Sequence, residues 1–99
     1  MKISLPHCTT KEEAVEKLKI HTPNLMERFG SEISGLKQNW AEEILDFSFM
    51  TYGFNVSGRI KIDINEVILD AKLPVLARTF ESQISGKIER LLKEIFDCN

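Results

Sequence analysis

The stretch FNVSGRIKIDINEVILDAKLP, residues 54–74, alternates apolar and polar side chains in two runs that only Asn65 and Glu66 separate. Alternation with a period of two is typical of a strand that buries one of its faces. Two such runs with a short polar pair between them predict a β-hairpin, in which Gly58 marks a bulge or a bend. The side chains expected to point inward are Phe54, Val56, Ile60, Ile62 and Ile64 in the first run and Val67, Leu69, Ala71 and Leu73 in the second.

Three further strands are expected to precede this hairpin. Ile3 and Leu5 alternate with polar neighbours until Pro6, which indicates a short first strand. Residues 33–40 form the weakest candidate strand, and residues 43–51 form a stronger one, whose inward residues are Leu45, Phe47 and Phe49. Such regular alternation favours an antiparallel sheet that is covered on one face only.

A helix is expected between the first and second strands. It begins at two overlapping capping boxes in the motif TTKEEA, residues 9–14, where hydroxyl groups can accept hydrogen bonds from the first amides. Gly30 is a natural end for this helix. Pro23 lies inside it and has no amide hydrogen to donate, so we expect a kink or a break there.

A second, longer helix is expected over residues 75–96, directly after Pro74. Apolar residues recur in it at spacings of three and four, which predicts one continuous stripe that packs across the sheet. The stripe consists of Leu76, Phe80, Ile84, Ile88, Leu91 and Ile95.

The order of these elements, β-α-β-β-β-β-α, defines an α+β fold of two layers. The expected architecture is an antiparallel sheet of four to five strands with the long C-terminal helix packed on one face. A chain of 99 residues suits one hydrophobic core, so residues 1–99 are expected to form a single α+β domain.

Composition and charge exclude several classes of protein. The chain is 42% apolar and 28% charged, which is ordinary for a soluble globular domain. Its net charge of −2 offers no general attraction to nucleic acid, so no nucleic-acid partner is expected. The N-terminus lacks the apolar run of a secretory signal, and no stretch approaches a transmembrane segment. We therefore expect a cytoplasmic protein, with Cys8 and Cys98 as free thiols.

No motif for catalysis, cofactor binding or metal binding stands out. GSEISG, residues 30–35, has the glycine spacing of a phosphate loop, but Leu36 occupies the position of the required lysine. The spacing of the histidines and cysteines is unlike that of a zinc site. Asp46, Asp63 and Asp70 are expected on the solvated face of the sheet, where nothing shifts their pKa values toward acid–base work. We therefore expect no enzyme activity, no cofactor and no metal.

The ordered set of motifs resembles the polyhydroxyalkanoic acid system (granule region) family. It comprises PH after the first strand, a helix that begins EEA and ends RFG, and then W....L.F, G....G.I.I, V.LDAKLP and I...IE..L. The resemblance spans Ile3 to Phe96. Pro23 and Pro74 depart from it, since relatives have an uninterrupted helix at the first position and tend to have glycine at the second. The resemblance implies a small bacterial protein linked by gene context to storage polyesters, with no assigned catalytic residues.

Two functions follow as hypotheses. The first is a small non-enzymatic accessory or binding protein associated with polyhydroxyalkanoate storage granules or their enzymes. The alternative is a small carrier of hydrophobic ligands of the helix-grip type, which rests on fold analogy. The expected partners are a protein or a granule surface, and a homodimer is a further hypothesis because the sheet leaves one face uncovered.

Any partner surface is expected on that outer face of the sheet. Ile44, Met50 and Ile68 alternate out of phase with the inward residues, so they should point away from the helices. Trp40 and Tyr52 are expected at the rim of this apolar group. Clusters of exposed apolar residues mark sites of association.

Overall fold

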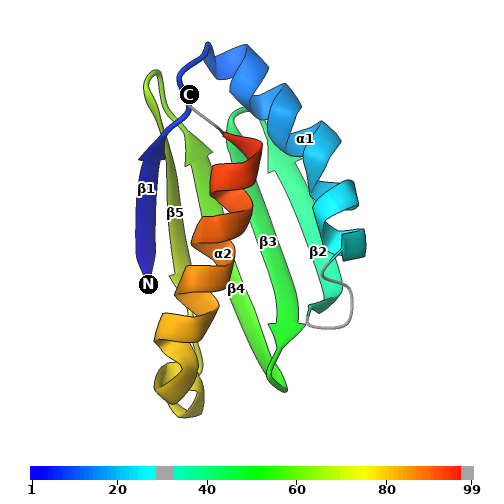
Figure 1. The fold of residues 1–99 in the computed structure, drawn as a ribbon, viewed down its shortest axis with the longest axis vertical. Coiled ribbons are helices and arrows are strands. Elements are labelled where there is room, and N and C mark those ends of the chain that lie inside the picture. The colour runs from blue at the N-terminus through cyan, green and yellow to red at the C-terminus, as the bar shows by residue number, and fades with distance from the viewer. Residues whose placement is uncertain (29–32, 97–99) are drawn as a thin grey trace.

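The computed structural model describes residues 1–28 and 33–96 (Figure 1). The elements are β1 (Lys2–Pro6), α1 (Lys11–Arg28), β2 (Ser34–Ala41), β3 (Ile44–Thr51), β4 (Phe54–Ile62), β5 (Glu66–Lys72), the 3₁₀ helix η1 (Val75–Phe80) and α2 (Glu81–Ile95). The five strands form one antiparallel sheet in the order β1-β5-β4-β3-β2. Both α-helices lie on the same face of this sheet (Figure 1). The two-layer α+β fold is thus confirmed, and β1 takes the edge beside β5.

The hairpin of β4 and β5 forms as its alternation predicts, with Ile62 opposite Val67. Its turn, however, lies one residue earlier than expected. The amide of Asp63 donates a hydrogen bond to the carbonyl of Glu66 at 2.8 Å, so the residues at the tip are Ile64 and Asn65. Ile64 is consequently 66% exposed, and its assignment to the inward face was wrong.

Gly58 does not produce a bulge, because β4 keeps continuous register with both neighbouring strands there. It lies opposite Phe47 on one side and Ala71 on the other. A Cβ atom at this position would lie 2.6 Å from the carbonyl oxygen of Asp70 and 2.7 Å from the Cα of Ala71. The glycine is required by this close backbone approach, and the irregular register lies instead in β2, between Ser34 and Lys37.

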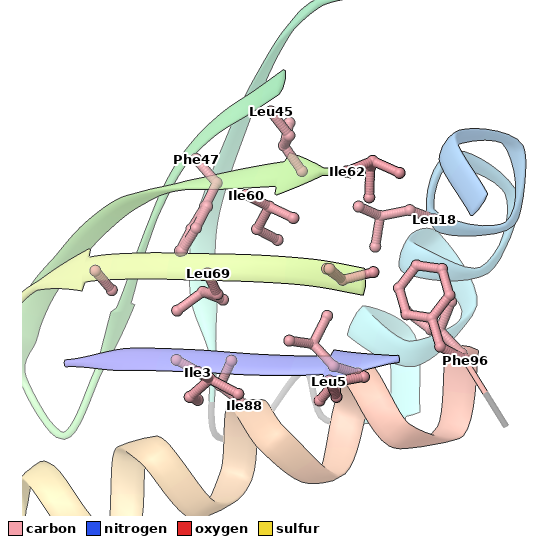
Figure 2. Packing of buried hydrophobic residues seen from close by; sticks show 14 of the residues in the cluster. Ile3, Leu5, Leu18, Leu45, Phe47, Ile60, Ile62, Leu69, Ile88 and Phe96 are labelled. Carbon is pink, nitrogen blue, oxygen red and sulfur yellow. The ribbon is translucent and has the colours of Figure 1, made fainter. Parts of the chain in front are cut away.

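The core fills the space between the sheet and the two helices (Figure 2). Alternate residues of the strands point toward the helices, and Leu18 of α1 and Ile88 of α2 meet them there. The buried apolar residues of the strands are Ile3, Leu5, Leu45, Phe47, Phe49, Val56, Ile60, Ile62, Val67, Leu69 and Ala71. Apart from Ile64, every inward position expected in the strands is buried or partly buried.

Helix α1 continues through Pro23 from Lys11 to Arg28, so the proline does not split it. The helix begins at the expected capping motif, where the amide of Glu13 donates to the hydroxyl of Thr10 at 3.1 Å. The Glu13 carboxylate accepts a hydrogen bond from the Thr9 hydroxyl. Directly before the proline, the hydroxyl of Thr22 donates to the carbonyl of Leu18, which lies four residues earlier. The expected stop at Gly30 lies outside the described residues.

The expected C-terminal helix is in fact two helices. Residues 75–80 form η1, and the α-helix starts only at Glu81. A 3₁₀ helix has three residues per turn, so the α-helical spacing does not extend back through it. Leu76, the first member of the expected stripe, is therefore 79% exposed. In α2, Leu92 is buried while Leu91 is only partly buried.

The expectation of free thiols was also wrong for Cys8, which is disulfide-bonded. It lies in the connection between β1 and α1, at a positive φ of 56°. Cys98, the other cysteine of the sequence, lies outside the described residues. The expectation rested on the redox state of a compartment, which says nothing about the distance between two side chains in the fold.

Candidate functional site

An apolar cavity of about 80 Å³ lies between α1, α2 and the inner face of the sheet. It is lined by Leu18, Thr22, Ile33, Leu36, Gln38, Leu45, Phe47, Phe49, Ile60, Leu69, Ile88, Leu91, Leu92 and Ile95. None of these side chains is titratable, and the Thr22 hydroxyl already donates to the carbonyl of Leu18. An apolar cavity of ~150 Å³ can hold a benzene ring. The cavity here therefore suits a short alkyl group, and it offers no acid or base for catalysis.

A second apolar feature lies at the end of the sheet where β3 turns into β4. Tyr52 and Gly53 form this turn, both with positive φ, as a tight hairpin of this kind requires. The Tyr52 ring stacks on Phe80 with their centroids 5.3 Å apart. In the 3₁₀ helix that leads to Phe80, Val75 and Leu76 are 77% and 79% exposed. We call Tyr52, Phe80, Val75 and Leu76 together the apolar end.

The structure places the residues of the expected partner surface on different faces. Ile44 and Ile68 both pair with Lys61 and point away from the helices. Met50 shares that outer face but lies six residues further along β3, which is ~20 Å in a strand. These three residues therefore do not form one continuous patch. Whether any of them contacts a partner stays a prediction.

Trp40 and Tyr52 lie on the helix side of the sheet instead of at the rim of the outer face. Trp40 pairs with the buried Leu45 and packs against the core, with the ammonium of Lys19 5.1 Å from its ring centroid. Tyr52 is covered on one side by Phe80, and the Lys87 ammonium lies 4.8 Å from its ring centroid. The orientations of Trp40 and Tyr52 depend on the irregular register of β2 and on the geometry of the turn between β3 and β4. The alternation of apolar and polar residues shows neither of these features.

Charged side chains dominate the rest of the outer face. Arg59 Nε lies 2.8 Å from Asp46 Oδ1 on the neighbouring strand. This hydrogen bond, and then the charge of Asp46, raise the pKa of Arg59 above its ordinary value. The Arg59 guanidinium is therefore protonated throughout the physiological pH range. Any contribution of its raised pKa to the free energy of unfolding is lost only at strongly alkaline pH. Asp70 lies opposite Arg59 on the other side, so charges alternate across the sheet.

Within residues 1–28 and 33–96, no group of three or more His, Cys, Asp or Glu side chains could hold a metal ion. No helix in the same part of the chain combines the length and the apolar character needed to cross a bilayer.

Comparison with known proteins gives one match. The family model described as "Putative polyhydroxyalkanoic acid system protein (PHA_gran_rgn)" matches residues 1–96. The chain belongs to this family. No curated protein and no solved structure matches it.

In this member of the polyhydroxyalkanoic acid system family, several motif residues have structural roles. His7, of the PH pair, is 1% exposed and closes the end of β1 onto the turn between β4 and β5. Its Nδ1 accepts a hydrogen bond from the Thr9 amide at 3.2 Å, so its Nε2 carries the proton and donates to the Asp63 carbonyl at 2.7 Å. The sequence alone could not reveal this role, because Asp63 is 56 residues away along the chain and reaches His7 only through the fold.

Proposed function

We propose that this protein is a non-enzymatic accessory protein of the polyhydroxyalkanoate system that acts in the cytoplasm at the storage granule. The observation that carries the proposal is the family match over residues 1–96. The exposed apolar side chains support it, because a protein that works at a polymer surface needs apolar groups in solvent.

The chemistry of the apolar cavity and of the polar outer face of the sheet supports a binding role in preference to catalysis. The lining of the cavity contains no titratable group, and the carboxylates on the outer face of the sheet lie in solvent or pair with Arg59. General acid–base catalysis needs a group whose pKa a pocket has tuned toward the working pH.

Granule association can be tested in cells that accumulate the polymer. The tagged full-length protein should move with the granules in a density gradient when the polymer is present. In the same strain without polymer synthase, it should stay in the soluble fraction. Recovery of the protein in the soluble fraction under both conditions would contradict the proposal.

The cavity between the helices favours a second candidate function, the transport of small apolar ligands. Its size suits the alkyl portion of a short acyl chain. Titration with butyrate and hexanoate should then shift the NMR signals of the methyl groups of Leu18, Leu45 and Leu92. Shifts that are spread evenly over the protein, or no shifts at millimolar ligand, would exclude this function.

The homodimer and the outer-face partner surface are tested together. Met50→Asp with Ile68→Asp places two charges on the outer face, where the exposed or half-exposed parent side chains make a folded variant feasible. If this face mediates association, the double variant should no longer self-associate in sedimentation velocity, or it should no longer capture in a pull-down the protein that the parent captures. A folded double variant that still associates as the parent does would exclude the outer face.

A further inference from the structure

We propose that the apolar end is the surface through which the protein contacts the storage polyester itself. The inference rests on the proposed function, since it names the part of the molecule that meets the granule. It differs from the outer-face hypothesis, because Val75 and Leu76 belong to the 3₁₀ helix that leads into α2 (Figure 1).

Exposure singles out this end of the molecule. Among the large apolar side chains whose exposure the structure describes, Val75 and Leu76 are the most exposed, at 77% and 79%. They are neighbours in sequence, and Tyr52, which is 47% exposed, stacks on Phe80 of the same 3₁₀ helix. The other exposed large apolar residues that the structure describes lie on separate elements, namely Ile20 on α1, Met50 on β3 and Ile64 in the turn between β4 and β5. Of the side chains described as strongly exposed, only Val75 and Leu76 are neighbours in sequence, and they share a 3₁₀ helix with Phe80, on which Tyr52 stacks.

The fold holds these side chains outward on a fixed support. The Pro74 carbonyl accepts a hydrogen bond from the Ala77 amide at 2.9 Å, which closes the first turn of η1. Ala77 is fully buried and anchors that turn to the protein. Because Ala77 faces the interior, Val75 and Leu76 project into solvent. Little conformational freedom is then lost when they enter an apolar phase.

The polar groups around the apolar end fit a polyester. A polyester presents alkyl groups and ester carbonyls, which accept hydrogen bonds and cannot donate them. Residues 73–80 contain Arg78 and no carboxylate, although the chain has more acidic than basic residues. The Lys87 ammonium lies 4.8 Å from the ring centroid of Tyr52. Arg78 is exposed in the same 3₁₀ helix as Leu76, and its guanidinium offers several hydrogen-bond donors. The first acidic residue after this segment is Glu81, whose Oε1 lies 3.8 Å from the N-terminal nitrogen of Met1.

The small size of the apolar end argues against a second copy of the chain as its occupant. A stable protein interface typically buries about 800 Å² on each partner. Two aliphatic side chains and part of one tyrosine ring cover only a fraction of such an area. We therefore assign the apolar end to a shallow contact with a polymer surface instead of an interface between two copies of the chain.

The test compares two double variants of the full chain. Val75→Ser with Leu76→Ser removes the exposed apolar groups of the apolar end. Ile20→Ser with Ile64→Ser removes the same kind of group elsewhere, and Ile64 lies at the opposite end of the sheet (Figure 1). All four side chains are more than half exposed, so both variants should fold, and circular dichroism and urea unfolding verify this. The probe is a suspension of amorphous polyhydroxyalkanoate particles without other proteins or lipid, and binding is measured by co-sedimentation.

The parent should bind the particles, and the variant of residues 75 and 76 should bind about tenfold or more weakly, because two aliphatic groups no longer leave water. The variant of residues 20 and 64 should bind like the parent. Equal binding of all three proteins would overturn this inference and leave the proposed function standing. A parent that fails to bind the particles would overturn this inference, while the density gradient of granules from cells decides the proposed function separately. Binding that requires anionic phospholipid vesicles in place of polymer would identify a lipid surface and overturn the inference as well.

Discussion

At the scale of single residues, Gly58 shows how one missing side chain allows the sheet to form. A Cβ atom there would meet backbone atoms of Asp70 and Ala71, which cannot withdraw without disturbing the pairing of β4 and β5. Gly58→Ala should therefore lower the free energy of unfolding by about 3 kcal/mol, as measured by urea denaturation. Gly86→Ala is the matched control, because a Cβ atom on that residue of α2 would meet no atom within 4 Å.

The control substitution should have the opposite sign. Alanine is favoured over glycine in a helix interior by about 0.5 to 1 kcal/mol, so Gly86→Ala should stabilise the protein. Equal effects of the two substitutions would show that close backbone approach is not the reason why residue 58 is a glycine.

His7 provides a second prediction at this scale. His7→Leu introduces an apolar side chain of similar size. It leaves the Thr9 amide and the Asp63 carbonyl without the ring nitrogens to which they are hydrogen-bonded. The loss should cost about 2 to 4 kcal/mol in the free energy of unfolding, because both groups lie in a partly buried site. His21 is exposed on α1, and His21→Leu should change the same free energy by no more than about 0.5 kcal/mol. A small effect of both substitutions would contradict the role given to His7.

At the scale of elements, α1 carries a proline that its helical backbone tolerates. Pro23 cannot donate to the carbonyl of Lys19, and its side chain is exposed. Pro23→Ala restores the donor and should raise the free energy of unfolding by about 1 to 3 kcal/mol. Asn24→Ala, at the next exposed position, changes no backbone donor and should have a much smaller effect. Thermal unfolding followed by circular dichroism at 222 nm measures both, and a destabilised Pro23→Ala variant would show that the proline fits its site.

The C-terminal helices offer a direct test of where the α-helical phase begins. Leu76 and Ile84 have equivalent positions in the stripe that the sequence predicts, yet Leu76 is 79% exposed and Ile84 is 1% exposed. Ile84→Ala should cost about 2 to 5 kcal/mol of unfolding free energy, while Leu76→Ala should cost less than about 0.5 kcal/mol. Comparable costs in urea denaturation would mean that the helix runs unbroken from residue 75.

At the scale of the whole molecule, the disulfide of Cys8 is a covalent link that stabilises the protein in addition to its hydrophobic core. Adding a reductant should lower the free energy of unfolding of the oxidised protein by about 2 to 4 kcal/mol, because the unfolded chain regains conformational freedom. Cys8→Ser should be as stable as the reduced protein and should not respond to the reductant. A parent whose unfolding midpoint ignores the reductant would contradict this expectation. Since cytosolic disulfides are rare, counting free thiols in protein taken directly from cells also tests the cytoplasmic part of the proposed function.

The candidate sites were harder to predict than the fold. The period of two correctly placed Ile44, Met50 and Ile68 on the outer face, because alternation alone decides which face a strand residue occupies. The six-residue spacing of Ile44 and Met50 in one strand also implied their separation, but only the strand pairing showed that Ile44 and Ile68 flank Lys61. The apolar end and the cavity were not visible in the sequence, since each combines residues from elements that are distant along the chain.

The amino-acid sequence by itself determined the order of the strands and α-helices, the inward residues of the strands apart from Ile64, and the family to which the chain belongs. These properties depend on local periodicity, capping residues and prolines, which act over a few neighbouring residues. Tertiary structure alone decided the place of β1 beside β5, the exposure of Val75 and Leu76, the burial of His7 and the close approach at Gly58. Each of these depends on how segments pack against one another, and a packing contact between distant residues leaves no periodic trace in one sequence.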